Sequence, residues 1–142
     1  PTGDVTMSPT FYVSALGDWM SAPLQRIQMV KGWIDADGET HEKVEDIACA
    51  DDLEVDPTTL RCPDNGASVD LTNCAPTGDT GAMELATTWQ DPEFDPTQGA
   101  FYYVRVLQNP TCRWSTYDAL RLGREPDRSI ATEKPGNVMA RG

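Results

Sequence analysis

LQRIQMVKGWI, residues 24–34, is the stretch of sequence that decides the fold. Ile27, Met29 and Trp33 recur with period two, the repeat of a β-strand with one buried face, and Lys31 interrupts the row. The sequence DADG at residues 35–38 then predicts a turn, because its glycine is free to adopt a positive φ. Residues 39–49 therefore return as the partner strand of a hairpin.

Short apolar runs separated by turn-forming residues continue on both sides of this hairpin. They predict strands at residues 10–15, 81–90 and 100–108, with 10–15 at an edge and 100–108 central, since both of its faces are apolar or aromatic. Residues 50–78 are rich in proline and glycine and predict a long loop with one short strand at 67–71. This rhythm is typical of an all-β antiparallel sandwich of immunoglobulin-like or fibronectin-like type.

The pattern changes after residue 112, where residues 115–123 predict a short helix. Ser115 is a candidate N-cap, Asp118 suits the first turn and Gly123 can end the helix. Residues 124–142 are polar and contain two prolines, so we expect a loosely held tail. The expected organisation is one sandwich domain at residues 1–123, followed by this tail at 124–142.

Four cysteines suggest two disulfides and hence an oxidising compartment, either the periplasm or the extracellular space. They stand at wide spacings, as Cys49, Cys62, Cys74 and Cys112. Three pairings are open, and we favour Cys62–Cys74 as a clamp on the long loop, with Cys49–Cys112 joining two strand ends. Free buried thiols and a metal site are the alternatives, although a zinc site usually shows closely spaced cysteine pairs.

The chain has 142 residues and a formal net charge of −12, which disfavours binding to nucleic acid or to anionic membrane surfaces. No apolar run approaches the roughly 20 residues of a membrane span. No secretory signal stands at the start, and the first residue is proline, so we interpret the chain as a piece of a longer exported protein.

The acidic clusters do not fit catalytic or metal-binding templates. Asp35 and Asp37 resemble part of a calcium loop, but placing Gly38 at the sixth position puts non-ligands at the first and twelfth. Asp91, Glu93 and Asp95 lie in a segment with Pro92 and Pro96, which favours a solvated turn over paired acid–base carboxylates.

We predict no catalytic residue, cofactor or metal in this chain. His41 is interpreted as a surface residue, and its use as a general base would require a carboxylate or cysteine nearby in space. Nucleophile and phosphate-binding motifs are absent from the sequence.

Aromatic and basic residues leave binding roles open. A carbohydrate-stacking platform and a plain sandwich core are both compatible with the aromatic set Trp33, Trp89, Tyr102, Tyr103 and Trp114. Lys31, Arg105 and Arg113 fit internal ion pairs. Together with Trp114 they are also the candidates for contact with a partner domain or an anionic ligand.

Several long segments resemble an exported bacterial family of unknown function. They include PLQRIQMVKGW at 23–33, RCPDNGASVD at 61–70, WQDPEFDP at 89–96, AFYYVRV at 100–106 and NPTCRWSTYD at 109–118. Together with shorter matches at 37–39 and 44–48, the resemblance covers most of residues 3–123. Family members usually close with an apolar, aromatic strand, whereas this chain ends with SIATEKPGNVMARG at 129–142.

The resemblance implies a place at the C-terminal end of a larger protein. The N-terminal region of the family resembles metal-dependent phosphoesterases of the polymerase-and-histidinol-phosphatase type, and its metal motifs have no counterpart here. The expected function is a non-catalytic accessory domain whose partner is the upstream catalytic domain of the same polypeptide. A carbohydrate-binding or small-ligand-binding module is the alternative, and a self-contained enzyme is a third hypothesis.

Overall fold

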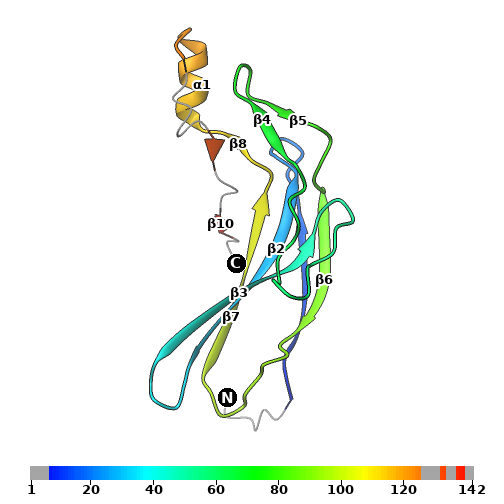
Figure 1. Ribbon diagram of the computed structural model, residues 1–142, viewed down its shortest axis with the longest axis vertical. Helices are drawn as coiled ribbons and strands as arrows, with labels where there is room; N and C mark the ends of the chain where they lie inside the picture. Colours follow the sequence, from blue (N-terminus) through cyan, green and yellow to red (C-terminus); the bar gives the residue numbers. More distant parts are fainter. Residues whose placement is uncertain (1–6, 126–131, 134–136, 140–142) are drawn as a thin grey trace.

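The computed structural model describes residues 7–125, 132–133 and 137–139, and it is built mainly of β-strands (Figure 1). One helix, α1, spans Trp114–Arg121. The longer strands are β1 (Thr10–Leu16), β2 (Leu24–Ile34), β3 (Thr40–Cys49), β6 (Glu84–Gln90) and β7 (Ala100–Gln108). The short strands are β4 (Ser68–Asp70), β5 (Ala75–Thr77), β8 (Thr111–Cys112), β9 (Thr132–Glu133) and β10 (Asn137–Met139).

All strand pairs within these sheets are antiparallel. The main sheet has the order β10-β7-β2-β3, and three two-stranded sheets pair β1 with β6, β4 with β5 and β8 with β9. Along the molecule, α1 and the β4–β5 hairpin lie at one end, and the β2–β3 turn lies at the other (Figure 1). The predicted class, mostly β and antiparallel with one short helix, is therefore confirmed.

The β1–β6 ribbon packs against one face of the main sheet, and the core lies between them. Leu24, Ile27, Ala50 and Leu85 form its buried centre. Val13 and Ala15 of β1 face this centre, whereas Tyr12 and Leu16 point away from it and are exposed. The period-two alternation of β1 thus sets which side chains enter the core.

The hairpin predicted at residues 24–49 is present with the expected bounds for its first strand. Asp35 accepts the turn hydrogen bond from the Gly38 amide, and Gly38 has a φ of 83°. A register shift between Ile27 and Gln28 interrupts the alternation, and Met29 and Val30 are both buried. β2 lies between β3 and β7, so this strand is more enclosed than period two alone indicates.

α1 begins one residue before the predicted helix and without the predicted cap. Arg113 is the N-cap residue, it makes no side-chain cap hydrogen bond, and Ser115 already lies inside the helix. Asp118 does not lie in the first turn. Gly123 follows the C-cap with a φ of 65°, the left-handed conformation expected of a glycine that ends a helix.

The favoured disulfide pairing is wrong. All four cysteines are bonded, as Cys49–Cys62 and Cys74–Cys112. Cys62 lies beside β3, because its amide donates to Asp46 in that strand, and this brings it to Cys49 rather than to Cys74. The loop at 50–78 is therefore held to β3 near its middle, at Cys62, and to β8 near its end, at Cys74.

The same loop contains more structure than predicted. The strand expected at 67–71 is β4, and the missed strand β5 pairs with it. A tight turn also forms between Asp56 and Arg61, whose backbones make an isolated bridge.

The segment predicted to be a loosely held tail contains β9 and β10. β9 pairs with β8, and β10 pairs with β7 at the edge of the main sheet. The edge position beside β7 is thus occupied, although by three residues only. The rest of residues 126–142 lies outside the described residues.

Two disulfides are typical of a protein outside the reducing cytoplasm. Within the described ranges, no helix is long and apolar enough to cross a membrane.

Candidate functional site

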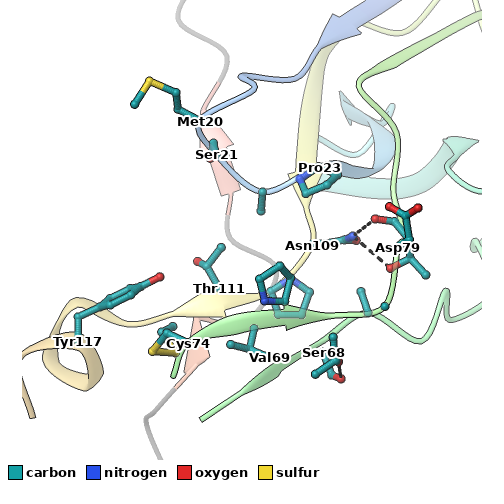
Figure 2. Close-up of a pocket in the computed structure, with 18 residues that line it drawn as sticks. Met20, Ser21, Pro23, Ser68, Val69, Cys74, Asp79, Asn109, Thr111 and Tyr117 are labelled. Atoms are coloured by element: carbon teal, nitrogen blue, oxygen red, sulfur yellow. Dashed lines mark hydrogen bonds between the residues drawn. A yellow bond between two sulfur atoms is a disulfide. The ribbon is translucent and has the colours of Figure 1, made fainter. Parts of the chain in front are cut away.

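A pocket of about 490 Å³ opens at the end of the molecule that carries α1 (Figure 2). Its walls come from the loop after β1, the β4–β5 hairpin, the segment before β6, and the segment from β7 to α1. The lining residues are Met20, Ser21, Ala22, Pro23, Ala67, Ser68, Val69, Cys74, Pro76, Thr77, Gly78, Asp79, Thr80, Asn109, Pro110, Thr111, Cys112 and Tyr117. This volume falls within the range of small-molecule sites.

The Cys74–Cys112 disulfide joins two walls of the pocket. It links the β4–β5 hairpin to β8, which leads directly into α1. Cys74 takes a left-handed φ of 59° at the tight turn between β4 and β5, and its amide donates to the Asp70 carbonyl. The covalent link therefore fixes the distance between the hairpin and the helix.

A chain of amide and carboxylate groups joins the segments on one side of the pocket. Asn109 is buried, and its side-chain amide donates to the Thr80 carbonyl at 2.8 Å. The Asn65 amide donates to the Asn109 oxygen at 3.0 Å and to Asp51 at 2.9 Å. Asp51 also accepts from the Gly81 amide at 2.7 Å. Three separate loops are thus fixed to one another by a polar network.

Large apolar side chains lie on one side of the pocket or next in the chain to that side. Met20 and Tyr117 line the pocket, and Figure 2 shows them on one side of it, with Asn109 and Asp79 on the other. Trp19 precedes Met20, and Trp114 lies one helical turn before Tyr117. The exposed fractions of Trp19, Met20 and Trp114 are 83%, 76% and 73%. We call Trp19, Met20, Trp114 and Tyr117 the apolar rim.

A second, shallower hollow lies at the opposite end of the main sheet, between Trp33, His41 and Phe101. His41 stacks on Trp33 with ring centroids 5.2 Å apart, and its Nε2 lies 2.7 Å from Asp35 Oδ2. The hydrogen bond from His41 holds the pKa of Asp35 below its ordinary value. His41 is exposed as predicted, but it has a partner, which corrects its interpretation as an isolated surface residue.

Lys31 lies inside the protein and not on a surface that a partner domain could touch. Its Nζ is 2.6 Å from Asp91 Oδ2 and donates to the Glu93 carbonyl at 2.8 Å. Asp91 also accepts from the Tyr102 hydroxyl at 2.7 Å. Burial raises the pKa of Asp91, but hydrogen bonds from Lys31, Tyr102 and the Glu93 amide outweigh it and keep that pKa low.

The turn at residues 91–96 is therefore not simply solvated. Asp91 is only 4% exposed, whereas Glu93 is exposed and binds Lys43 at 2.8 Å. Burial, together with the hydrogen bond to Asp91, also raises the pKa of Tyr102. Asp91 and Glu93 are held by different lysines, and the carboxylates at 91, 93 and 95 form no cluster suited to a metal ion among the described residues.

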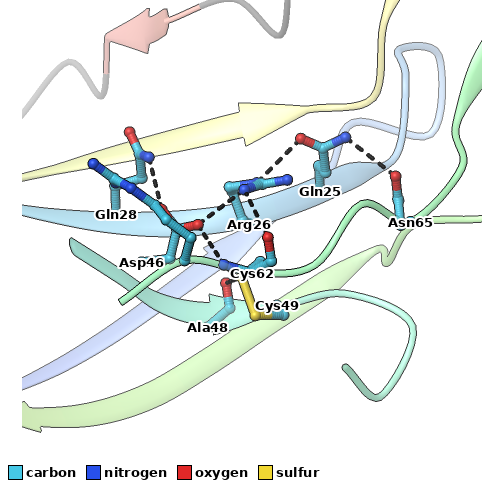
Figure 3. Close-up of polar contacts among 9 residues, drawn as sticks. Gln25, Arg26, Gln28, Asp46, Ala48, Cys49, Cys62 and Asn65 are labelled. Carbon is cyan, nitrogen blue, oxygen red and sulfur yellow. Dashed lines mark hydrogen bonds and ion pairs between the residues drawn. A yellow bond between two sulfur atoms is a disulfide. The ribbon is translucent and has the colours of Figure 1, made fainter. Parts of the chain in front are cut away.

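A second buried carboxylate, Asp46, was not found from the sequence (Figure 3). Its side chain is fully buried and accepts from Arg26 at 2.9 Å, Gln28 at 2.7 Å and the Cys62 amide at 2.7 Å. Arg61 approaches it at 3.4 Å. The available signal was an acidic residue in a strand with apolar residues, Val44 and Ala48, two positions away on either side, because such a group needs buried donors.

The remaining predicted contact residues stay near the surface. Arg105 donates to the Tyr103 hydroxyl at 3.0 Å and lies over its ring, 5.6 Å from the centroid. Arg113 is exposed at the N-terminal end of α1, next to Trp114. Of the four candidates, Trp114 belongs to the apolar rim and Arg113 precedes it in the chain, whereas Lys31 and Arg105 lie elsewhere.

The pocket near α1 offers hydrogen-bonding and apolar groups to a ligand. No group of three or more His, Cys, Asp or Glu side chains suited to a metal occurs within residues 7–125, 132–133 and 137–139. The buried carboxylates Asp46 and Asp91 are engaged by cations, and the pocket is lined by hydroxyl, amide and apolar groups with one acid, Asp79.

Comparison with known proteins identifies a family. The sequence profile of a family described as "Protein of unknown function (DUF3604)" matches residues 2–135. No curated protein and no solved structure matches the chain.

Proposed function

The chain belongs to the DUF3604 family of unknown function, and we propose that it is a non-catalytic accessory domain of a larger exported protein. Its partner is another domain of the same polypeptide, which resembles metal-dependent phosphoesterases. The observation that carries the proposal is the apolar rim. Met20 lines the pocket and is more than 70% exposed, as are Trp19, the residue before it, and Trp114, one helical turn before Tyr117. Exposed apolar groups gathered in this way are typical of a surface that another domain covers.

The fold and the environment are part of the same proposal. The ribbon β1–β6 and the main sheet form two layers of an immunoglobulin-like sandwich, supported by the core between them. The protein acts in the periplasm or outside the cell, supported by two disulfides.

Methionine oxidation tests the accessory role, since the chain offers a matched pair. Met20 in the rim and Met7 before β1 are 76% and 79% exposed, and the whole length of β1 separates them. Brief peroxide treatment followed by peptide mass spectrometry should oxidise both at similar rates in the isolated chain. In the full-length gene product we expect Met20 to react at least about tenfold more slowly, with Met7 unchanged. Equal oxidation of Met20 in both would refute the proposal.

An activity assay gives an independent test of the non-catalytic role. The isolated chain should not hydrolyse phosphate or sulfate esters with added divalent metal ions. Hydrolysis by purified chain, at a rate that follows its concentration, would assign catalysis to the chain itself.

A carbohydrate-binding or small-ligand-binding module is the second candidate. It is favoured by the pocket, where the Tyr117 ring and the polar groups of Asp79 and Thr111 face one space. Tryptophan fluorescence against a glycan panel tests it, because Trp114 lies one turn from Tyr117. We expect a saturable shift that Tyr117→Ala removes, and no shift with any glycan would argue against this function.

A further inference from the structure

β1 has an unused edge. Among the described strands, β1 pairs only with β6, and the ladder runs from Thr10↔Gln90 to Leu16↔Glu84. In an antiparallel pair, alternate residues direct their amide and carbonyl groups away from the partner. β1 therefore presents a row of backbone donors and acceptors about 23 Å long on its far side.

The burial of the main sheet decreases on the same side. Residues that pair across β2 and β7 lie on the same face of the sheet, and Ile27 pairs with Val106, as Met29 does with Val104. Ile27 and Met29 of β2 are 0% and 1% exposed. Val104 and Val106 are only partly buried, although they are equally apolar and one strand away. The layer that covers β2 thus becomes incomplete over β7.

The position of the ribbon explains this gradient. β6 contacts β2 and β3, and its Trp89 reaches Tyr102 of β7 with ring centroids 6.1 Å apart. Phe11 of β1 lies closer to that ring, at 5.0 Å, so β1 is the strand of the ribbon nearer to β7. The main sheet continues past β7 to β10. The next place in the upper layer, beside β1, therefore lies above β7 and β10.

The edge of β1 also lacks the usual protection against pairing. Its sequence, TFYVSAL, contains neither a charged residue nor a proline. Natural edge strands that stay unpaired commonly carry such residues, because an open row of donors and acceptors invites another strand. In a chain with net charge −12, seven successive uncharged residues at an edge are compatible with a covered strand.

We propose that an extended segment from another part of the same polypeptide pairs with β1 and adds a third strand to the β1–β6 sheet. This rests on the proposed accessory role. The segment has apolar side chains at alternate positions, which pack on Val104 and Val106, and it carries no net negative charge. A second copy of the chain does not fit, since pairing through β1 would bring its own main sheet into the space of β7 and β10.

Amide hydrogen exchange of β1 tests the proposal. In the isolated chain we expect alternation along residues 10–16, with amides that donate to β6 exchanging at least about a hundredfold more slowly than their neighbours. In the full-length gene product all of them should be slow. Alternation that persists in the full-length product would overturn the proposal. Uniform protection in the isolated chain would overturn it too, and sedimentation would show whether a second copy causes it.

A matched pair of variants locates the added strand. Tyr12 and Thr88 face each other across the ribbon, and both are exposed. In the full-length product, Tyr12→Glu should speed exchange of the outward β1 amides by at least about tenfold, because residue 12 lies next to the added strand. Thr88→Glu, one strand further away, should not, and equal effects would refute the assigned edge.

If Met20 is protected in the full-length product while β1 still alternates, the accessory role stands and strand addition fails. If neither changes, both fail.

Discussion

Replacing Asp46 with asparagine tests whether the buried carboxylate organises the loop at 50–62. The side chain is 0% exposed and accepts from Arg26, Gln28 and the Cys62 amide at 2.9, 2.7 and 2.7 Å. Asparagine has nearly the same shape, but it offers one acceptor oxygen in place of two and turns an amide toward these donors. Arg26 would then be left without its charged partner, at a position where its side chain is only 17% exposed.

The magnitude follows from the burial. Removing one partner of a buried ion pair costs about 3–5 kcal/mol, whereas a surface pair is worth about 0–1 kcal/mol. Because the carboxylate also accepts a buried backbone amide, we expect Asp46→Asn to lower the free energy of unfolding by about 3–4 kcal/mol. That is a large part of the roughly 5–15 kcal/mol typical of a domain.

Urea unfolding with intact disulfides, followed by tryptophan fluorescence, measures this loss. Asp37→Asn is the matched control, because Asp37 is exposed in the β2–β3 turn, and it should change stability by less than about 0.5 kcal/mol. A double-mutant cycle with Arg61→Ala should give a small coupling, since Arg61 is 46% exposed and 3.4 Å from Asp46. A loss below about 1 kcal/mol for Asp46→Asn, with an unchanged denaturant slope, would refute the reasoning.

Three further predictions concern glycine positions, the disulfides and pH. Gly81→Ala should cost about 2–4 kcal/mol by urea unfolding, since φ is +97° and the new Cβ would lie 2.6 Å from Pro23 Cβ. Gly32→Ala should cost less, because the new Cβ meets the Phe101 ring, which is exposed and can move. A larger loss of stability for Gly32→Ala than for Gly81→Ala would contradict this reasoning. Replacing both cysteines of Cys74–Cys112 by alanine should lower the free energy of unfolding by about 4 kcal/mol, because this disulfide joins residues 38 apart in sequence. The same change at Cys49–Cys62, whose cysteines are 13 apart, should lower it by about 3 kcal/mol. Equal losses of melting temperature in the two variants would argue against the loop-entropy reason. The pKa of Asp91 is lower in the folded state, so the stability that its charge contributes is fully present above about pH 4 and is lost as the pH falls through the folded-state pKa. Asp91→Asn should therefore make the free energy of unfolding depend less on pH in that acid range. A pH dependence of stability that is unchanged in the variant would exclude this role.

The longer strands could be predicted because their signals are local. Period two along residues 24–34, the turn at Gly38 and the apolar run at 100–108 each depend on residues close together in sequence, and β2, β3 and β7 follow them closely. β5 and β8 were missed because three and two residues cannot show a period, and they form only where the rest of the fold supplies a partner.

The candidate site could be predicted only in part. Arg113 and Trp114 were singled out from the sequence and lie beside the pocket or in its rim. Trp19, Met20 and Asn109 were not, because the pocket brings together loops from residues 17–23, 67–80 and 109–117. Nothing in the spacing of these loops along the chain indicates that they meet.

Alternation of apolar residues, turn chemistry and an even number of cysteines determined by themselves that this chain is a β-rich, disulfide-bonded protein. Only the tertiary structure decided that Cys49 bonds Cys62, that Lys31 meets Asp91 and that Asp46 holds the loop beside β3. The physical reason is range: strand formation depends on neighbours two residues apart, whereas disulfides and buried ion pairs depend on where the folded backbone brings distant residues together.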